Sequence, residues 1–260
     1  MTVKIETVYA VYFSPTHGTK AYVEGIARRL SEQFEVIDLT RPENRAKEYW
    51  FGPTDLVILG APVYAGRLPS VQGGVFDRLH GDGTPAIFNV SYGNRDYDDA
   101  LLEEKNLCEG SGFVGIAAAA WIAPHTFSDA LAAGRPDAQD EGRLDQFAQQ
   151  VRALLSGAEQ GRALKVKGNE PYKETRAMPF HPVGNEDCAG CRLCASVCPT
   201  GAIDPARPKE TDESVCIDCL ACAKACPAHA RGIFEPMFAG MVQKLEAGIG
   251  NTRKEPEFYL

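Results

Sequence analysis

Five short apolar runs alternate with amphipathic stretches along the first 155 or so residues of the chain. Apolar runs of this length, separated by helix-like segments, are typical of strands that are buried on both faces of a parallel sheet. The predicted strands are Val8–Phe13, Glu35–Leu39, Leu56–Gly60, Ala86–Ser91 and Val114–Trp121. The predicted helices are Lys20–Gln33, Val71–Leu79, Asp98–Leu107 and Glu141–Leu155. The pattern therefore predicts an α/β fold with a doubly wound, five-stranded parallel sheet.

The pattern breaks after the last of these helices. Residues Ser156–Asn185 are rich in charge, Gly and Pro and have no sustained period, so we interpret them as a flexible linker. A cysteine-rich repeat comes next, followed by an amphipathic stretch, Met237–Leu245. We expect a sheet domain over residues 1–156, a linker over 157–184, a small second domain over 185–235, and a C-terminal helix and tail over 236–260.

Composition and charge narrow the classes of partner. The 260 residues are 44% hydrophobic and 24% charged, as in folded globular proteins, and the formal net charge is -8. This negative charge argues against nucleic acids and anionic membranes as partners. The most apolar segment, Phe113–Ala123, is much shorter than the ~20 residues of a membrane span, and the N-terminus lacks the pattern of a signal peptide. We therefore expect a cytoplasmic protein with no membrane span.

The cysteine-rich repeat contains two copies of the spacing C-x2-C-x2-C-x3-C-P, 28 residues apart. Clustered thiols in the cytoplasm are more often metal ligands than disulfides. The spacing is that of bacterial ferredoxins, in which the fourth cysteine of each run binds the other cluster. We assign one 4Fe-4S cluster to Cys188, Cys191, Cys194 and Cys226, and a second to Cys216, Cys219, Cys222 and Cys198.

Two zinc sites are the alternative, because sets of four thiolates also bind zinc. Zinc sites rarely require this spacing twice with a proline after each set, so the repeat favours iron-sulfur clusters. The repeat resembles the two-cluster 4Fe-4S ferredoxins, with all eight ligand positions present, and this resemblance implies a small α+β domain. Cys108 lies outside both sets, and we interpret it as a buried apolar residue.

The loop after the first predicted strand, SPTHGTK, leads into a helix. Its hydroxyl groups and the backbone N-H groups of the helix N-terminus suit a dianionic phosphate. The loop resembles the phosphate loop of flavodoxins, over a region of about Val3–Leu155, and the resemblance implies FMN. His17 departs from it, because the family usually has a small residue such as Gly there. The FMN-binding residues implied in this loop are Ser14, Thr16, His17, Gly18 and Thr19.

Two further loops follow predicted strands at the edge of the sheet where doubly wound folds bind ligands. Tyr64 is placed to cover one face of an isoalloxazine ring, and Tyr97 is available for the other. Aromatic loop residues are often only packing, but their joint position at consecutive strand ends favours a ring site. The predicted ring-binding residues are Ala61, Pro62, Val63, Tyr64, Ala65 and Gly66 in one loop, and Ser91, Tyr92, Gly93, Asn94 and Tyr97 in the other.

Nearly the whole chain resembles the flavodoxin-ferredoxin fusions of anaerobic microbes. A flavin exchanges one or two electrons and each 4Fe-4S cluster exchanges one, so the resemblance implies an electron carrier between partner oxidoreductases. The alternative is a flavin-dependent reductase of a small molecule or quinone that the clusters supply with electrons, with His125 as its one evident acid or base. A structural zinc-and-nucleotide module is a third possibility. The acidic chain is expected to dock on basic surfaces of redox partner proteins, and the sequence leaves its oligomeric state open.

Overall fold

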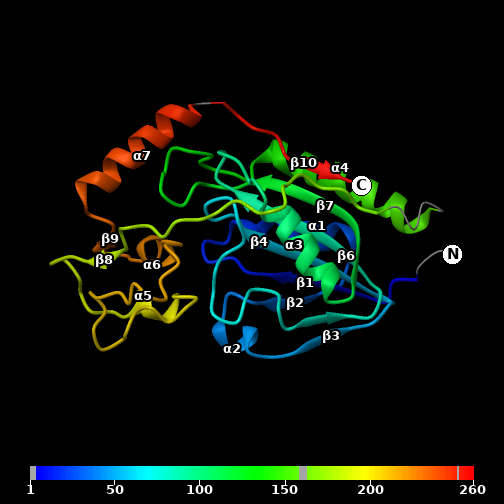
Figure 1. The fold of residues 1–260 in the computed structure, drawn as a ribbon, viewed down its shortest axis with the longest axis horizontal. Helices are drawn as coiled ribbons and strands as arrows, with labels where there is room; N and C mark the ends of the chain where they lie inside the picture. Colours follow the sequence, from blue (N-terminus) through cyan, green and yellow to red (C-terminus); the bar gives the residue numbers. More distant parts are fainter. Residues whose placement is uncertain (1–3, 158–162, 251) are drawn as a thin grey trace.

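A computed structural model describes residues 4–157, 163–250 and 252–260, which form a sheet domain and a smaller cysteine-rich domain beside it (Figure 1). The six strands of the main sheet lie in the order β10-β7-β6-β4-β1-β2, and all except β10 are parallel. The parallel strands are β1 (Thr7–Tyr12), β2 (Glu35–Asp38), β4 (Asp55–Pro62), β6 (Thr84–Tyr92) and β7 (Phe113–Ile122). Counted along the chain, these five lie in the flavodoxin-like order 2-1-3-4-5. The predicted doubly wound parallel sheet is therefore confirmed.

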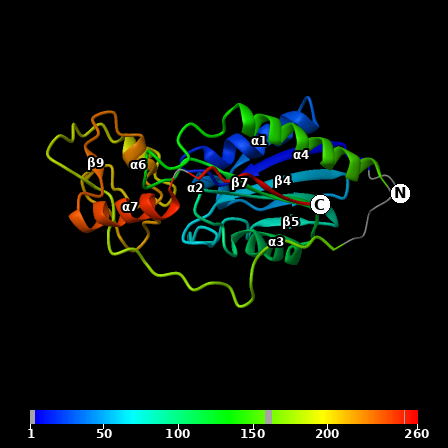
Figure 2. The same ribbon diagram turned by 90° about the horizontal axis from the view of Figure 1, so that it is seen from above.

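Helices cover both faces of this sheet. The helices α1 (Gly18–Leu30) and α4 (Ala138–Ser156) lie on one face, and α3 (Ala100–Gly110) lies on the other (Figure 2). Each face has its own buried apolar cluster. On the α1 and α4 face, Trp121 stacks on Tyr22 with ring centroids 4.9 Å apart. Because these five strands run parallel, their carboxyl ends lie at one edge of the sheet, where the predicted ligand loops begin.

The predicted helix Val71–Leu79 is wrong. The chain turns there, and β5 (Leu79–Gly81) pairs in parallel with β3 (Tyr49–Phe51) in a separate two-stranded sheet. Gly73 and Gly74 have φ values of 78° and 69°. These lie in the left-handed region, which a right-handed helix does not include and which glycine adopts without strain. The glycine pair therefore ends the helical pattern. The one-turn helix α2 (Pro42–Arg45), which the pattern did not predict, lies between β2 and β3.

The cysteine-rich domain is built from two similarly folded copies. The strand β8 (Val183–Gly184) pairs antiparallel with β9 (Arg231–Gly232), and the one-turn helices α5 (Leu193–Ser196) and α6 (Ala221–Lys224) follow the two cysteine loops. Residues with positive φ recur at the same 28-residue offset as the cysteines: Gly190 and Asp218, Arg192 and Leu220, and Gly201 and His229. The internal duplication in the sequence is thus also a duplication of backbone conformation.

Much of the predicted linker is fixed to the sheet domain. Residues 158–162 of the linker lie outside the described residues. Leu164 is 7% exposed and belongs to the core cluster on the α3 face. The backbone N-H groups of Asn169 and Lys173 donate to the two carboxylate oxygens of Asp99, at 2.8 and 2.6 Å. The segment from Leu164 to Lys173 is therefore docked beside α3, and the interpretation of the whole linker as a flexible chain is wrong.

The C-terminal segment returns from the cysteine-rich domain to the sheet. The amphipathic stretch Met237–Leu245 lies within α7 (Pro236–Ile249), as predicted, and β10 (Glu257–Tyr259) then pairs antiparallel with β7 (Figure 1). A strand of three residues is too short to show a period in the sequence. The cysteine-rich domain is consequently inserted between α4 and β10 and attached to the sheet domain at both ends. No helix in the three described ranges has the length and apolar character that crossing a membrane requires.

Candidate functional site

The loop between β1 and α1 leaves backbone N-H groups available at the helix N-terminus. The Lys20 N-H donates to Ser14 Oγ at 3.0 Å, so the Ser14 hydroxyl closes the loop onto the helix. The N-H groups of Gly18 and Thr19 have no acceptor within the described part of the chain. Unpaired N-H groups at the start of a helix carry partial positive charge and attract anions. The loop therefore has the chemistry that a phosphate group requires.

His17 precedes α1 with a left-handed backbone, φ 66° and ψ -1°. This conformation costs a non-glycine residue roughly 1–2 kcal/mol, whereas glycine adopts it freely. The preference of flavodoxins for a small residue such as Gly at this position is thus explained by the left-handed backbone. The His17 side chain is exposed and makes no cap hydrogen bond. His17 therefore affects the stability of the loop, while the path of the loop still allows an anion site.

A small cavity next to this loop gathers residues from several strand ends. The hydroxyl oxygens of Thr19 and Ser91 lie 2.7 Å apart and share a hydrogen bond between α1 and β6. A Cβ at Gly18 would lie only 2.8 Å from Ala123 Cβ, so the close approach of α1 to the end of β7 requires glycine. The cavity is lined by Ser14, Pro15, Thr16, Gly18, Thr19, Pro62, Val63, Tyr64, Ser91, Tyr92, Gly93, Ala123, Pro124 and Thr126.

Ten of the sixteen predicted FMN-binding residues belong to this lining, and six do not. Tyr97 is fully buried and donates its hydroxyl to Glu257 Oε2 at 2.5 Å, so its side chain is engaged with β10 and does not reach the cavity. The Asn94 side-chain amide donates to the Thr252 carbonyl at 2.8 Å. The other four residues outside the lining are His17, Ala61, Ala65 and Gly66.

The predicted FMN-binding residues did not include Pro15, Ala123, Pro124 and Thr126, which also line the cavity. Ala123 and Pro124 follow the end of β7, so the strand-end rule could have identified them. They have no side-chain donors or acceptors that would single them out in the sequence.

A larger cleft, of about 1890 Å³, lies between the two domains. It exceeds the ~300–1,000 Å³ of common small-molecule sites. Its lining includes Tyr64, Gly93 and His125 from the sheet domain and Cys216, Ile217 and Asp218 from the cysteine-rich domain. The Tyr64 hydroxyl oxygen is buried and has no hydrogen-bond partner among the described residues. Burial raises the pKa of Tyr64 well above its usual value, and nearby Cys219 adds to the effect. The strand-end loop thus meets the second cysteine loop at Tyr64.

His125 lines the same cleft. Its ring packs closely against Gly93, where a Cβ would lie 2.4 Å from the ring Cδ2. The Nδ1 atom accepts a hydrogen bond from the Phe127 N-H at 3.1 Å, so Nε2 carries the proton of the neutral ring. Burial, together with the charges of Arg95 and Lys224, lowers the pKa of His125 to about 4. His125 is therefore a neutral hydrogen-bond donor near pH 7.

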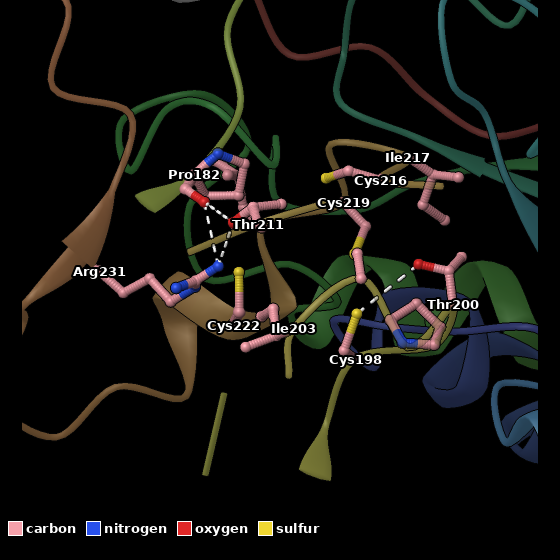
Figure 3. A pocket seen from close by; sticks show the side chains of 13 residues that line it. Pro182, Cys198, Thr200, Ile203, Thr211, Cys216, Ile217, Cys219, Cys222 and Arg231 are labelled. Atoms are coloured by element: carbon pink, nitrogen blue, oxygen red, sulfur yellow. Dashed lines mark hydrogen bonds between the residues drawn. The ribbon is translucent and has the colours of Figure 1, made fainter. Parts of the chain in front are cut away.

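The eight cysteines of the repeat line two cavities and form no disulfides among themselves. The first cavity is lined by Cys198, Cys216, Cys219 and Cys222 (Figure 3), and the second by Cys188, Cys191, Cys194 and Cys226. Each cavity combines three cysteines of one copy with the fourth of the other, which is the grouping that a crossed ligand assignment requires. Cys108, which is 1% exposed, lies in the core of the sheet domain, outside both sets.

Burial makes the thiols of the first cavity unfavourable as unpaired thiolates. It raises the pKa of Cys216 to about 12 and also raises the pKa of Cys219 and of Cys222. Thiolates in such surroundings need a compensating positive charge, which bound metal supplies. Four converging thiols in an otherwise largely apolar cavity therefore fit a metal cluster.

The second cysteine copy and the fourth cysteine of the first copy face the sheet domain. Arg45 Nη2 donates to the Pro199 carbonyl, next to Cys198, at 2.7 Å. Ile217 packs against the core cluster on the α3 face. By contrast, Cys191 of the other set is exposed to solvent. The first cavity thus lies at the domain boundary, and the second lies further out.

Comparison with known proteins identifies one family in the chain. Residues 187–231 match the family of 4Fe-4S dicluster domains. No curated protein matches the chain in sequence. Similar solved structures include a flavodoxin from the domain Archaea, at 12% identity and a TM-score of 0.41, over 58% of this chain and 99% of that one. The Streptococcus pneumonia TIGR4 flavodoxin is 17% identical, with a TM-score of 0.41, over 57% and 99%.

A third similar structure is the flavodiiron core of Flv1 from Synechocystis sp. PCC6803, at 16% identity and a TM-score of 0.38, over 58% of this chain and 36% of that one. The strand order of the sheet, rather than these distant similarities, assigns the flavodoxin-like fold. With the dicluster match, the chain combines a flavodoxin-like domain with a ferredoxin-type 4Fe-4S domain, as the resemblance to flavodoxin-ferredoxin fusions implied.

Proposed function

We propose that this protein is an electron carrier that relays electrons between FMN, two 4Fe-4S clusters and partner oxidoreductases. The observation that carries the proposal is the shared cleft, whose lining includes both the strand-end loop at Tyr64 and the cysteine loop at Cys216. When bound, FMN exchanges one or two electrons and each cluster exchanges one. The protein's own contribution is to hold these sites close together.

The residues available for FMN divide into a phosphate end and a ring end. At the phosphate end, the N-H groups of Gly18 and Thr19 and the hydroxyls of Thr16 and Thr19 offer donors to an anion. At the ring end, the predicted contacts that line the cavity are Pro62, Val63, Tyr64, Ser91, Tyr92 and Gly93. The loop offers a site for a single terminal phosphate in a flavodoxin-like sheet, which favours FMN over FAD.

The two cavities support the crossed assignment of cluster ligands and suggest an order for the relay. In this proposal, the cavity of Cys198, Cys216, Cys219 and Cys222 would hold the cluster nearer the flavin, because Cys216 and Ile217 also line the shared cleft. The cavity of Cys188, Cys191, Cys194 and Cys226 would hold the outer cluster. The exposed Cys191 puts the outer site within reach of a partner protein. The net charge of -8 favours a partner with a basic docking surface, and a thiol-rich chain suits the reducing cytoplasm.

A flavin-dependent reductase is a second candidate, because the cleft is larger than a flavin ring needs and holds the neutral donor His125. A small molecule or quinone bound there would be reduced at the flavin. Turnover of quinones by the purified protein, without any partner protein, would favour this candidate over the carrier.

The first test is the metal and cofactor content of anaerobically purified protein. We expect near-equal iron and acid-labile sulfide, about eight of each per chain, and one FMN. Zinc without sulfide would overturn the iron-sulfur proposal, and FAD in place of FMN would overturn the flavin assignment.

The second test separates the two cluster sites by single substitutions. Cys198→Ser should alter the paramagnetic signal of the cluster held by the second loop, and Cys226→Ser that of the cluster held by the first. Cys108→Ser, in the core of the sheet domain, is the matched control and should leave both signals unchanged. If each substitution instead damages the cluster of its own loop, the crossed assignment is wrong.

A further inference from the structure

Arg231, at the start of β9, lies between the two cysteine cavities and lines both of them. Figure 3 shows its side chain beside Cys222 in the first cavity. Only 5% of the residue is exposed to solvent. Within the described residues, no carboxylate forms an ion pair with its guanidinium group. Arg231 is thus a buried cation at the boundary of two thiol clusters.

Neutral oxygen atoms satisfy most of the guanidinium hydrogen bonds. Arg231 Nη1 donates to the Pro208 carbonyl at 2.6 Å, and Nη2 donates to the Pro182 and Glu210 carbonyls at 3.1 and 3.2 Å. Nη2 also donates to Thr211 Oγ1. The Nε atom is buried without a partner among the described residues. These contacts orient the group, but none of them neutralises its charge.

A buried charge without a counter-ion is costly, because it loses the solvation of water. Carbonyl dipoles offset only part of that loss. The negative groups that flank Arg231 are the thiolates which the two cysteine sets would contribute to bound clusters. The arrangement therefore becomes favourable when both cavities hold negatively charged clusters.

The internal duplication shows that packing alone does not require a cation here. The position equivalent to Arg231 in the first copy, 28 residues earlier, is Ile203. Ile203 is also buried, at 4% exposure, and it lines the first cavity. An apolar side chain thus fills this position in the first copy, whereas the second copy has a positively charged side chain there.

We propose that Arg231 is an internal counter-ion shared by the two cluster sites, and that its charge raises the reduction potential of both. This inference rests on the proposed iron-sulfur function. One electron enters each site on reduction, with no bond made or broken. Arg231 stays positively charged, because a guanidinium group is not deprotonated in proteins. Its positive charge makes each added electron more favourable.

The test is a redox titration of the full chain with both clusters in place, using dithionite as the one-electron donor. Arg231→Gln should lower the equilibrium constant for electron uptake about tenfold or more at both sites, which is ~59 mV per tenfold change for one electron. Arg231→Lys keeps the charge and should stay near wild type. Arg207→Gln is the matched control, because it removes the same charge from an exposed side chain paired with Asp204 and Glu210.

Each outcome decides the proposal. Potentials in Arg231→Gln that equal those of Arg207→Gln would overturn it. So would a lysine variant that shifts as far as the glutamine variant, because the role would then be the forked hydrogen bonding and not the charge. If Arg231→Gln binds no iron, the lysine variant decides. Both clusters at wild-type potentials in Arg231→Lys support the proposal. Shifted potentials in Arg231→Lys, or a lysine variant that also binds no iron, overturn it. Wild-type protein without sulfide would instead reject the proposed function itself.

Discussion

The hydroxyl oxygens of Tyr97 and Tyr259 lie 2.6 Å apart, although the whole cysteine-rich domain separates the two residues in sequence. The Tyr97 hydroxyl donates to Glu257 Oε2 at 2.5 Å, and the single proton of Tyr259, whose hydroxyl oxygen lies 3.1 Å from the same carboxylate oxygen, is available to Tyr97 or to Glu257. Tyr97 precedes α3, and Tyr259 belongs to β10. This contact fixes the end of the chain to the flavodoxin-like sheet, and it means that the cysteine-rich domain is attached on both sides.

The two attachments lead to a prediction about a cut linker. A protease site inserted between Gly157 and Leu164 should leave the two fragments associated after cleavage, because β10 still pairs with β7 and Asp99 still binds the Asn169 and Lys173 backbone. Electron transfer from the clusters to the flavin should keep a rate that is independent of protein concentration. Stopped-flow mixing over a tenfold range of concentration measures this rate.

The comparison for the cut chain is the same cut in a protein that lacks residues 252–260. Losing β10 should weaken the association of the fragments and make the rate rise with concentration. Separation of the fragments with β10 present, on size-exclusion chromatography, would show that the C-terminal strand does not hold the domains together.

A second prediction concerns the contact between Arg45 and Pro199. Arg45→Gln removes a charged donor from the Pro199 carbonyl, a contact worth ~1.5–3 kcal/mol, and should allow the domains to separate more often. We expect slower electron transfer between the flavin and the clusters, and a broader size distribution in small-angle X-ray scattering. Arg41→Gln, which removes the same charge from an exposed neighbour, is the control. Equal rates in the two variants would contradict a clamping role for Arg45.

The third prediction tests the phosphate loop. Thr19→Ala removes a hydroxyl from the cavity and also leaves the buried Ser91 hydroxyl without its partner at 2.7 Å. FMN binding should weaken by about 1.5–3 kcal/mol, the range for a lost hydrogen bond to a charged group. Thr19→Ser keeps the hydroxyl and should bind FMN nearly as wild type does. Fluorescence titration of the apoprotein with FMN measures both affinities, and equal loss in the two variants would point to the lost methyl group instead.

The fourth prediction concerns pH and His125. Its pKa in the folded chain is about 4, below the usual value of about 6.5, so the unfolded chain takes up the proton first as the pH falls. The stability that the neutral ring contributes is complete above pH 6.5 and is lost between pH 6.5 and 4. From pH 7.5 to 5.5, the free energy of unfolding should fall by roughly 1 kcal/mol from this group alone.

His125→Gln should remove this part of the pH dependence. Urea unfolding followed by tryptophan fluorescence reports on the flavodoxin-like domain, because both tryptophans, Trp50 and Trp121, lie there. A variant that loses as much stability as wild type over this range would show that other groups account for the effect.

The parallel strands and the two cysteine sets follow from local features of the sequence. An apolar run predicts the strand Ala86–Ser91, which lies within β6 (Thr84–Tyr92), because a strand buried on both faces needs a largely apolar stretch. The cysteine spacing predicts that the first three thiols of each copy lie on one loop and bind the same cluster. The apolar pattern predicts the wrong element at Val71–Leu79. The neighbouring residues favour a helix there, but Gly73 and Gly74 have a left-handed backbone that a right-handed helix excludes.

Only the tertiary structure decides which distant groups meet. Three such contacts join segments that are far apart in sequence: β10 pairs with β7, Asn169 docks on Asp99, and Tyr97 is buried against β10. The residues involved show no periodic pattern. The place of Arg231 between two cavities has the same origin. An arginine is ordinary in a sequence, and it becomes unusual here because folding removes water from the side chain and brings no carboxylate of the described residues to it. The sequence thus determined the two kinds of domain and their ligand types, and the fold determined how the two domains face each other.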